Sequence, residues 1–267
     1  MAQRQVSAYA EMVLTCNEDF HCTGEKVLQE HALLRVVSGQ LTVIQAEKST
    51  ICEAGQTLLF PKNQLFTLSK QCYDGRPYKS VIISLPTQLL RAFYEKNTLK
   101  DLRPAEAEIL KLDQDALLDS LFASMLPYFD LNKPLPEKLV EIKTHEAIEI
   151  LRNVRPDIDG ILSDFSEPGK INLADFMEKN YMFNISLDKF ARLTGRSLTT
   201  FQRDFKKAFE MSPQRWLTRK RLALAHYQLS EKRKRPVDVY FETGFENLSH
   251  FSYAFKKQFG YPPTMLP

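Results

Sequence analysis

Two segments near the end of the chain share one pattern of apolar and charged positions. They are LTTFQRDFKKAFE, residues 198–210, and LSHFSYAFKKQFG, residues 248–260. Phenylalanine recurs at every fourth position in both, which places the Phe side chains along one face of a helix. A pair of adjacent lysines follows the second Phe in each segment. The pattern predicts two amphipathic helices that are near copies of each other, offset by about fifty residues.

A shorter helix and a glycine turn are predicted before each copy. Ser and Asn are favoured N-caps, proline suits the first helical turn, and glycine adopts the positive φ that ends a helix. Helix, glycine turn and helix are the layout of a helix-turn-helix. The residues that predict these ends are Ser186, Gly195 and Ser197 in the first copy, and Pro236, Gly244 and Asn247 in the second.

The two helix-turn-helix units are joined by PQRWLTRKRLALAHYQLS, residues 213–230, which we interpret as a rigid connecting helix. Its spacing of apolar residues predicts that one side faces inwards. His226 lies among these residues, and we interpret it as a packed or surface histidine rather than a ligand or base. The residues predicted to face inwards are Trp216, Leu217, Leu222, Ala225, His226 and Leu229.

The first third of the chain shows a different period. Residues 27–85 contain short apolar stretches separated by the turn signals SGQ, EAGQ and PKNQ, which predict several strands in a small barrel or jelly roll. The segment SVIISLP, residues 80–86, is a further strand that its proline ends. The predicted core residues of this barrel are Leu33, Val37, Leu41, Val43, Leu58, Phe60, Ile82 and Leu85.

From Thr87 the apolar spacing becomes helical. Helices are predicted within residues 87–101, 105–130 and 136–154, and prolines punctuate them. The helix Ala105–Tyr128 either packs on the barrel or also pairs two subunits, and the sequence leaves both open. Residues 155–170 are interpreted as a connector, or as a helix end followed by a short linker.

The fold class that follows is α+β and multidomain. Residues 1–86 are predicted to form the β-barrel, residues 87–165 a helical extension for dimerisation and linkage, and residues 166–267 an all-α domain with two helix-turn-helix units.

Charge is divided unevenly between these regions. The 267 residues include 36 Lys and Arg and 33 Asp and Glu, a net charge of +3. From Pro168 to the end there are 18 basic and 9 acidic residues, whereas the preceding part has 18 basic and 24 acidic ones. The basic final third therefore predicts a polyanionic partner.

Cysteine usage and hydropathy predict a cytoplasmic protein. Cys16, Cys22, Cys52 and Cys72 form no C-x-x-C pair, which favours reduced thiols over a disulfide framework or a zinc site. Redox sensing by one thiol is the alternative. No apolar run has the length of a membrane-spanning helix, and the first residues lack the pattern of a secretory signal.

The final hundred residues resemble the DNA-binding domain of the AraC/XylS family of transcription regulators. The resemblance rests on the two helix-turn-helix units at this spacing and on a signature in the second: Gly244-Phe245, His250-Phe251, Ala254-Phe255-Lys256, Phe259-Gly260 and a proline shortly after. It implies a bacterial transcription regulator, an activator, whose partners are double-stranded DNA and RNA polymerase. Two recognition helices of this kind enter successive segments of the DNA major groove, about 34 Å apart.

The chain departs from the family pattern at two positions. Tyr240 stands where the family has a small alanine, which predicts a repacked contact in the second unit. Glu210 replaces the glycine that ends the first recognition helix.

Base contacts and phosphate contacts are predicted from different residues. Outward positions near the start of each recognition helix are those that the family uses to recognise bases, and an arginine there suits a guanine whereas a glutamine suits an adenine. The predicted base-reading residues are Thr199, Gln202, Arg203, Ser249, His250, Ser252 and Tyr253. The predicted phosphate contacts are Arg196, Lys206, Lys207, Arg219, Lys220, Lys256 and Lys257, with the basic run of residues 232–235 in addition.

The role of the first domain stays open between three hypotheses. The first 85 residues resemble the cupin-like barrel of many family members, which senses a small-molecule effector or pairs subunits. A protein partner is the alternative to a small molecule, and a cupin-type enzyme is the third. Cupin enzymes hold a metal with an H-x-H pair, whereas His21 and His31 lie ten residues apart here. We therefore predict no metal, no cofactor and no catalytic residues, and name no effector-binding residue.

Overall fold

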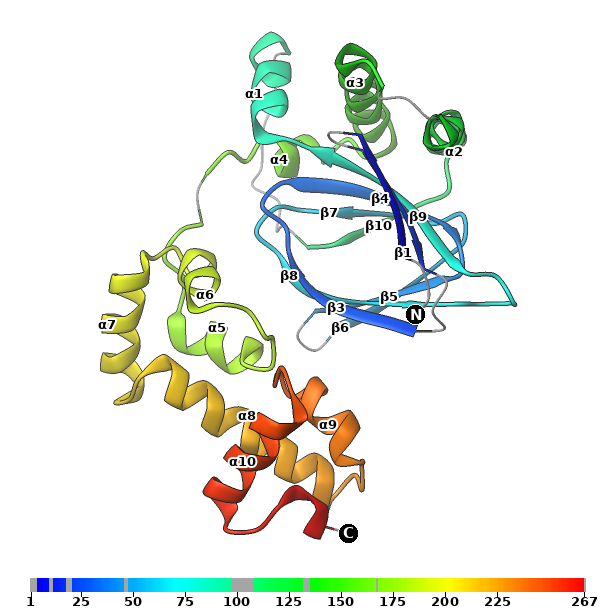
Figure 1. Ribbon diagram of the computed structural model, residues 1–267. Helices are drawn as coiled ribbons and strands as arrows, with labels where there is room; N and C mark the ends of the chain where they lie inside the picture. The colour runs from blue at the N-terminus through cyan, green and yellow to red at the C-terminus, as the bar shows by residue number, and fades with distance from the viewer. Residues whose placement is uncertain are drawn as a thin grey trace. The chain divides into compact units, whose positions relative to one another are not determined.

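The computed structural model describes residues 4–9, 12–17, 21–45, 48–97, 108–131, 135–166 and 168–266. The chain forms two compact units, Met1–Ser166 and Glu167–Pro267. Strands belong to the first unit, whereas the described part of the second is helical (Figure 1). The predicted fold class, a β-rich N-terminal part and an all-α C-terminal part, is confirmed.

Two antiparallel sheets face each other in the N-terminal unit (Figure 1). One has six strands in the order β1-β2-β9-β4-β7-β10: β1 (Arg4–Tyr9), β2 (Met12–Asn17), β9 (Tyr78–Leu85), β4 (His31–Ser38), β7 (Thr57–Phe60) and β10 (Leu110–Leu112). The other has four strands in the order β3-β8-β5-β6: β3 (His21–Val27), β8 (Leu65–Gln71), β5 (Gln40–Gln45) and β6 (Lys48–Glu53).

The three predicted turns lie between strands, and each contains a residue with positive φ. These residues are Gly39 (φ 73°), Gly55 (φ 84°) and Asn63 (φ 60°). Gly39 joins β4 to β5, and a Cβ atom there would lie 2.7 Å from the Cα of Tyr78. Any side chain at this turn would collide with β9, so the glycine is needed for close approach as well as for its backbone angle.

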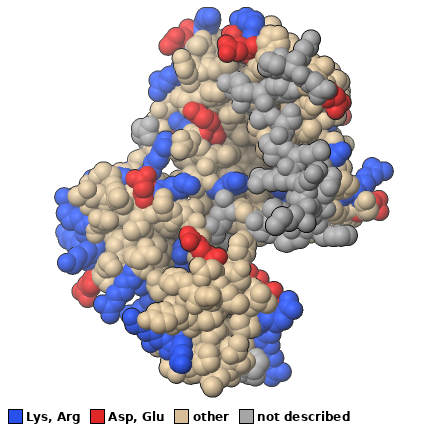
Figure 2. Space-filling model, in the orientation of Figure 1, with Lys and Arg blue, Asp and Glu red and all other residues tan. Residues whose placement is uncertain are grey.

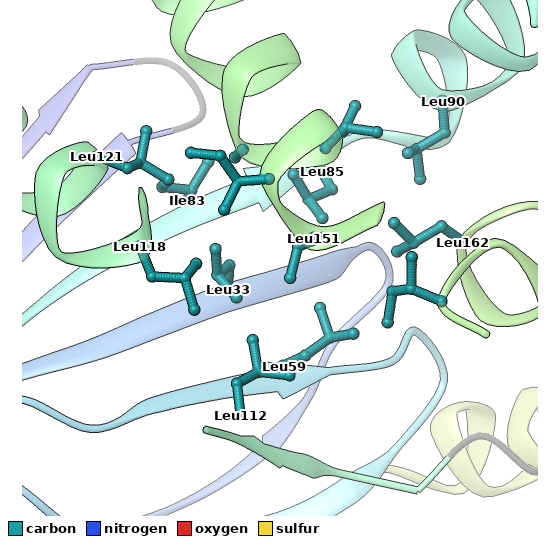
Figure 3. Packing of buried hydrophobic residues seen from close by; sticks show 14 of the residues in the cluster. Leu33, Leu59, Ile83, Leu85, Leu90, Leu112, Leu118, Leu121, Leu151 and Leu162 are labelled. Atoms are coloured by element: carbon teal, nitrogen blue, oxygen red, sulfur yellow. The ribbon is translucent and has the colours of Figure 1, made fainter. Parts of the chain in front are cut away.

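The six-stranded sheet is covered on both faces, which explains why its central strand lacks an alternating pattern. Residues 31–36 of β4 are all buried. Leu34 and Val36 belong to the core between the two sheets, whereas Leu33 belongs to the core between the sheet and the helices. Figure 3 shows this second core, in which Leu33 and Leu59 lie opposite Leu118 and Leu151. Because both faces are covered, apolar residues follow one another at positions 32–34, and the polar side chains of His31 and Arg35 are buried as well.

Helices occupy the rest of the described chain. In the N-terminal unit they are α1 (Thr87–Lys96), α2 (Ala116–Met125), the 3₁₀ turn Leu126–Asp130, α3 (Glu137–Val154) and α4 (Asp159–Leu162). In the C-terminal unit they are α5 (Leu173–Asn180), α6 (Leu187–Leu193), α7 (Leu198–Phe209), α8 (Pro213–Ser230), α9 (Pro236–Glu242), α10 (Leu248–Phe259) and the 3₁₀ turn Pro263–Met265.

One prediction for the N-terminal unit was incomplete and another was wrong. Strands begin at Arg4, ahead of the residues 27–85 whose pattern predicts strands: β1 and β2 form a hairpin, and β2 and β3 pair with β9 and β8. Residues 110–112, which were predicted to be helical, form β10 on β7. Three residues fit either period, and the free edge of β7 selects the strand. The start of the predicted helix at Ala105 lies outside the described residues.

Most of the predicted barrel core is buried, with two exceptions. Val37 and Ile82 are half-buried and pack at the margins of the two cores, whereas the other six predicted residues are buried. Among the described cysteines, Cys52 is buried in the barrel core and Cys72 is half-buried, and both are free thiols. None of the described helices combines the length and the apolar character that a bilayer crossing requires.

Candidate nucleic-acid interface

Helices α6 and α7 form the first helix-turn-helix unit, and their ends are set by local sequence. The Ser186 hydroxyl caps α6 and the Ser197 hydroxyl caps α7, each by accepting a hydrogen bond from a backbone N–H. Gly195 between them has φ 66°, and a Cβ atom there would lie 2.4 Å from the Gly169 backbone. The predicted caps and turn are therefore confirmed, and the turn is packed too tightly for any other residue.

Helices α9 and α10 repeat this arrangement. Pro236 occupies the first turn of α9, Gly244 makes the turn with φ 85°, and the Asn247 side chain caps α10. The two second helices also end alike, because Glu210 and Gly260 both adopt the left-handed conformation. Glu210 thus accepts the backbone angle of the glycine that it replaces, at some conformational cost.

The Phe stripes attach both second helices to one connecting helix, α8. Phe201 and Phe205 in α7, and Phe251 and Phe255 in α10, are fully buried. The Phe205 ring lies 5.6 Å from the Trp216 ring of α8, and the Phe255 ring is stacked with the His226 ring at 6.1 Å. His226 also makes a 2.8 Å hydrogen bond with the Tyr261 hydroxyl, so it is a packed histidine, as predicted. The other residues predicted to face inwards from α8 are buried.

One arginine of α8 ties the two units together. Arg221 donates hydrogen bonds to the carbonyl oxygens of Tyr181 at 2.8 Å and Phe183 at 2.7 Å, which precede the first unit. It also donates to the carbonyl oxygen of Gly244, in the turn of the second unit, at 2.9 Å. A planar guanidinium with several donors can hold three acceptors in a fixed geometry. Arg221 therefore helps to fix the separation of α7 and α10.

The residues predicted to contact bases lie on the solvent-facing sides of α7 and α10. Thr199, Gln202 and Arg203 are exposed, and the Arg203 side chain is 75% exposed with only a 3.4 Å contact to Asp204. On α10 the exposed residues are Ser249, His250 and Tyr253, whereas Ser252 is half-buried. The second helix of each helix-turn-helix unit, α7 or α10, thus has its predicted base-reading residues on the face opposite its buried Phe side chains.

Most residues predicted to contact phosphates are exposed on the surface of the C-terminal unit. Lys206, Lys207, Arg219, Lys256 and Lys257 are exposed. Figure 2 shows Lys and Arg side chains gathered over α7 and near α10. In the basic run 232–235, Lys234 pairs with Glu242 at 2.5 Å and Arg235 with Asp238 at 2.9 Å.

Two of the residues predicted to contact phosphates, Arg196 and Lys220, have partners within the C-terminal unit. The side chain of Arg196 is only 11% exposed, and its guanidinium contacts Asp204 at 3.2 Å and two backbone carbonyls. The hydrogen bond from Arg196 lowers the pKa of the Asp204 carboxyl below its ordinary value. Lys220 pairs with Glu178 at 2.6 Å and lies over the Trp216 ring. The Arg196 side chain is held away from solvent by its partners, whereas the Lys220 side chain is paired but stays 38% exposed.

A groove of about 850 Å³ lies between α8 and α10. Arg215 and Arg219 line it from α8, and His250, Tyr253 and Lys257 line it from α10. Arg215 was not among the predicted contacts, and the role of Arg221 was not predicted either. In the sequence, both arginines belong to a set of four basic residues on one helix, at positions 215 and 219–221. The sequence does not reveal in which direction each of these side chains points.

Tyr240 packs without disturbing the second unit. It is half-buried against the core formed by α8, α9 and α10, and its ring makes an edge contact with Phe241 at 6.5 Å. The backbone N–H of Phe245 still donates to the Tyr240 carbonyl at 2.9 Å, which closes the turn. The large side chain is therefore accommodated at the margin of the core.

An apolar cavity opens at the barrel core of the N-terminal unit. Its volume is about 280 Å³, and its walls come from both sheets, with Phe60, Phe66 and Ile82 among the apolar residues and Lys26 and Lys70 at its polar edge. The Lys70 ammonium lies 5.2 Å from the centre of the Tyr78 ring. Within the described residues, no group of three His, Cys, Asp or Glu side chains is arranged to hold a metal ion.

Two family models match the chain. One, described as a helix-turn-helix domain, covers residues 190–266, and the other, described as the ExsA N-terminal regulatory domain, covers residues 31–151. The virulence regulon transcriptional activator VirF of Yersinia enterocolitica is 37% identical over 242 residues, covering 88% of each chain. The HTH-type transcriptional regulator ExsA of Pseudomonas aeruginosa is 26% identical over 264 residues, covering 95% of this chain and 92% of ExsA.

Among solved structures, a single-substitution variant of ToxT from Vibrio cholerae, in its apo form, aligns over 95% of this chain and 96% of its own, with 10% identity and a TM-score of 0.44.

Proposed function

Because the chain belongs to the AraC/XylS family of DNA-binding transcription regulators, we propose that α7 and α10 are its two recognition helices and that each enters one of two successive major-groove segments. The observation that carries this proposal is the equivalence of the two helices. Both turn a buried Phe stripe towards α8 and a polar face towards solvent, and Arg221 links the two units.

Base recognition is assigned to the exposed residues Thr199, Gln202 and Arg203 of α7 and Ser249, His250 and Tyr253 of α10, together with the half-buried Ser252 of α10. Arg203 is suited to a guanine and Gln202 to an adenine, whereas serine and tyrosine hydroxyls discriminate less between bases. The first unit is therefore proposed to supply most of the sequence preference.

Phosphate contacts are assigned to the exposed cations Lys206, Lys207, Arg219, Lys256 and Lys257. Arg196 and Lys220 are assigned a supporting role, because their charged groups already have partners within the unit. Arg196 orients Asp204, which in turn contacts Arg203 beside the proposed base-reading face.

The regulatory role is assigned to residues 1–165. We assign residues 1–86 to a barrel that responds to an effector, and residues 87–165 to subunit pairing and to the link with the DNA-binding domain, residues 166–267. The apolar cavity beside Lys26 and Lys70 supports a small-molecule effector. A protein partner is the second candidate, supported by the exposed Ile142 and Leu117 side chains on α3 and α2. Activation requires contact with RNA polymerase, and the cytoplasm is the compartment where both partners are found in bacteria.

Selection of bound sequences from a random pool of duplexes tests the proposal. Full-length protein should enrich a site with two conserved segments whose centres lie about one duplex turn, 10–10.5 base pairs, apart. The same selection repeated with cell metabolites, and then with cell extract, distinguishes a small effector from a protein partner. Failure to bind any duplex in dilute salt would refute the proposed function.

A further inference from the structure

The linker between α4 and α5, residues 163–172, is attached at its first half to the N-terminal unit. Phe165 packs at the margin of the core between the sheet and the helices. The Arg91 Cζ atom lies 4.5 Å from the centre of the Phe165 ring, and Nη2 donates a hydrogen bond to the Phe165 carbonyl oxygen at 3.3 Å. Lys62, in the turn between β7 and β8, donates to the Ser166 carbonyl oxygen at 3.1 Å. Residues 164–166 and these two cations are called here the latch.

The latch also has a defined local conformation. The Asp164 carboxylate accepts hydrogen bonds from the Ser166 backbone N–H at 2.9 Å and from the Ser166 hydroxyl at 2.5 Å. An aspartate that binds the backbone two residues further on closes a turn. The Tyr94 ring of α1 makes an edge contact with the Phe165 ring at 6.3 Å. The first half of the linker is therefore folded onto α1 and onto the β7–β8 turn.

The second half of the linker belongs to the first helix-turn-helix. The turn at Gly195 packs on the linker backbone, because a Cβ atom there would lie 2.4 Å from atoms of residues 168 and 169. Arg196, which follows this turn, donates from Nη1 to the Ile171 carbonyl oxygen at 3.1 Å. The same guanidinium contacts Asp204 on α7. This half of the linker is thus one wall of the first turn and a support for Arg196.

A single residue, Glu167, separates the two attached halves, and it lies outside the described residues. Consecutive Cα atoms are 3.8 Å apart, so the two peptide units from residue 166 to residue 168 extend to about 7 Å. A displacement of the latch beyond this length must pass to residue 168. Chain connectivity therefore couples the latch to the first turn.

The equivalent turn of the second helix-turn-helix has different neighbours. A Cβ atom at Gly244 would lie 2.4 Å from the Met182 carbonyl oxygen and 2.9 Å from Nε of Arg221. The two turns are alike in backbone conformation, with φ of 66° at Gly195 and 85° at Gly244. The nearest neighbours of the first turn are linker residues, whereas those of the second are not. The linker can therefore influence the two turns unequally.

The proposed effector cavity is connected to the latch through two strands. Phe60 lines the cavity at the end of β7 and precedes Lys62 by two residues. Ala32 also lines the cavity, and it follows His31, whose Nδ1 accepts the Lys62 backbone N–H at 3.2 Å. A change in the cavity walls thus reaches Lys62 by two routes.

On the basis of the proposed function, we infer that the latch is the route by which the N-terminal unit regulates DNA recognition, and that it acts on the first helix-turn-helix and not on the second. With the latch closed, residues 168–171 are held against the turn at Gly195. Opening of the latch lets these residues leave the turn, so Arg196 loses a partner that positions it beside Asp204. The regulated property is the base preference in the DNA segment that α7 contacts.

Cleavage of full-length protein by glutamyl endopeptidase tests the latch without DNA. The enzyme cuts after glutamate, and cleavage at Glu167 follows the population of the opened linker. Lys62→Ala combined with Arg91→Ala, the latch variant, should raise the rate at Glu167 about tenfold, since a cation–π contact and two hydrogen bonds from charged donors are lost. Lys48→Ala combined with Lys96→Ala is the matched control, because both are exposed lysines of the same unit. The control should be cleaved at the wild-type rate.

Fragment masses identify the bond that is cut, and circular dichroism reports whether each variant remains folded. Hydrogen exchange of full-length protein then compares the two turns within one molecule. In the latch variant, the amides of residues 194–197 should exchange faster than in the wild type, because their linker neighbours leave more often. The amides of residues 243–246, in the equivalent turn, should keep the wild-type rate and serve as the internal control.

DNA binding tests the regulatory part of the inference. The probes are the duplex obtained from the random-pool selection and its single-base-pair variants. Binding by the latch variant should show a flatter base preference within the segment contacted by α7. The preference within the segment contacted by α10 should keep its wild-type shape.

The outcomes separate this inference from the proposed function. If wild-type protein binds no duplex, the proposed function fails, while cleavage and exchange still test the latch. The inference is overturned if the folded latch variant is cleaved at Glu167 at the wild-type rate, or if residues 194–197 exchange no faster than in the wild type. It is also overturned if the base preference changes in neither DNA segment, or in both alike.

Discussion

The Arg221 guanidinium lies against Gly244, with Nη1 donating a hydrogen bond to the Gly244 carbonyl oxygen at 2.9 Å. The contact joins the middle of α8 to the turn of the second helix-turn-helix. Its other two hydrogen bonds reach the segment that precedes α6. Hydrogen bonds from a charged donor are strong. Because the Arg221 guanidinium donates to three carbonyl oxygens, it fixes the orientation of α8 relative to the segment before α6 and to the turn between α9 and α10.

Replacement of Arg221 by methionine should weaken the link between the two helix-turn-helix units of the C-terminal domain. Methionine keeps an unbranched side chain but removes all donors, and hydrogen bonds to charged groups contribute about 1.5–3 kcal/mol each without being additive. We expect the C-terminal unit to lose about 2–4 kcal/mol of unfolding free energy. Trp216 fluorescence in urea measures this loss within the full-length protein. Arg219→Ala is the control, since this exposed side chain should affect DNA binding without affecting stability.

Gly244 should tolerate a methyl group far less well than Gly260. Both have φ near +85°, but a Cβ atom at Gly244 would lie 2.4 Å from the Met182 carbonyl oxygen, whereas at Gly260 nothing lies within 4 Å. Gly260→Ala should cost about 1 kcal/mol for the backbone angle alone. Gly244→Ala adds a collision with backbone and should cost about 3 kcal/mol or more. Equal urea midpoints for the two variants, measured by Trp216 fluorescence, would contradict this account.

Sequence alone was sufficient for the parts of the C-terminal unit that depend on local chemistry. The caps at Ser186, Ser197 and Asn247 were predictable because each acts on its own helix within three residues. The directions of Arg196 and Lys220 were not, because the partners of these side chains come from other elements. Spacing along a helix identifies a solvent-facing position but not whether a distant carboxylate or carbonyl is within reach.

The N-terminal unit was less predictable, because its strands pair over long distances in sequence. β2 forms a hairpin with β1, but the hairpin joins the sheet through β9, and β3 pairs with β8; both of these partners are distant in sequence. β10 is a three-residue edge strand that exists because β7 offers unpaired backbone groups. The core residues Leu33 and Leu58 were predictable, since apolar side chains in a strand are buried whichever sheet they face.

Arg203 and Lys256 should differ in what they contribute to DNA binding. Arg203 lies on the proposed base-reading face of α7, so Arg203→Ala should relax the preference at one base pair, with a cost of about 1–3 kcal/mol on the best site only. Lys256 lies in the last turn of α10 and is exposed. Lys256→Ala should weaken binding to all duplexes alike and reduce the salt slope by about one.

Competition binding with a set of single-base-pair variants of the selected duplex measures both effects. The Arg203→Ala profile should flatten at one position and keep its shape elsewhere. An equal loss on every duplex would assign Arg203 to the backbone. Lys179→Ala, an exposed lysine of α5 outside the proposed interface, serves as the charge-matched control for Lys256.

His31 should make the stability of the N-terminal unit depend on pH. Burial, with a smaller effect from Lys62, lowers its pKa from 6.5 to about 4, and its Nδ1 accepts the Lys62 backbone N–H at 3.2 Å. Since the unfolded chain binds the proton below pH 6.5 and the folded chain only near pH 4, stability is lost as the pH falls through this window. At about 1.4 kcal/mol per pKa unit, the loss is about 3 kcal/mol. Urea unfolding followed by circular dichroism at pH 7 and pH 4 should show this loss in the wild type relative to His31→Asn, which cannot titrate. Parallel losses in the two proteins would mean that His31 is not the group responsible.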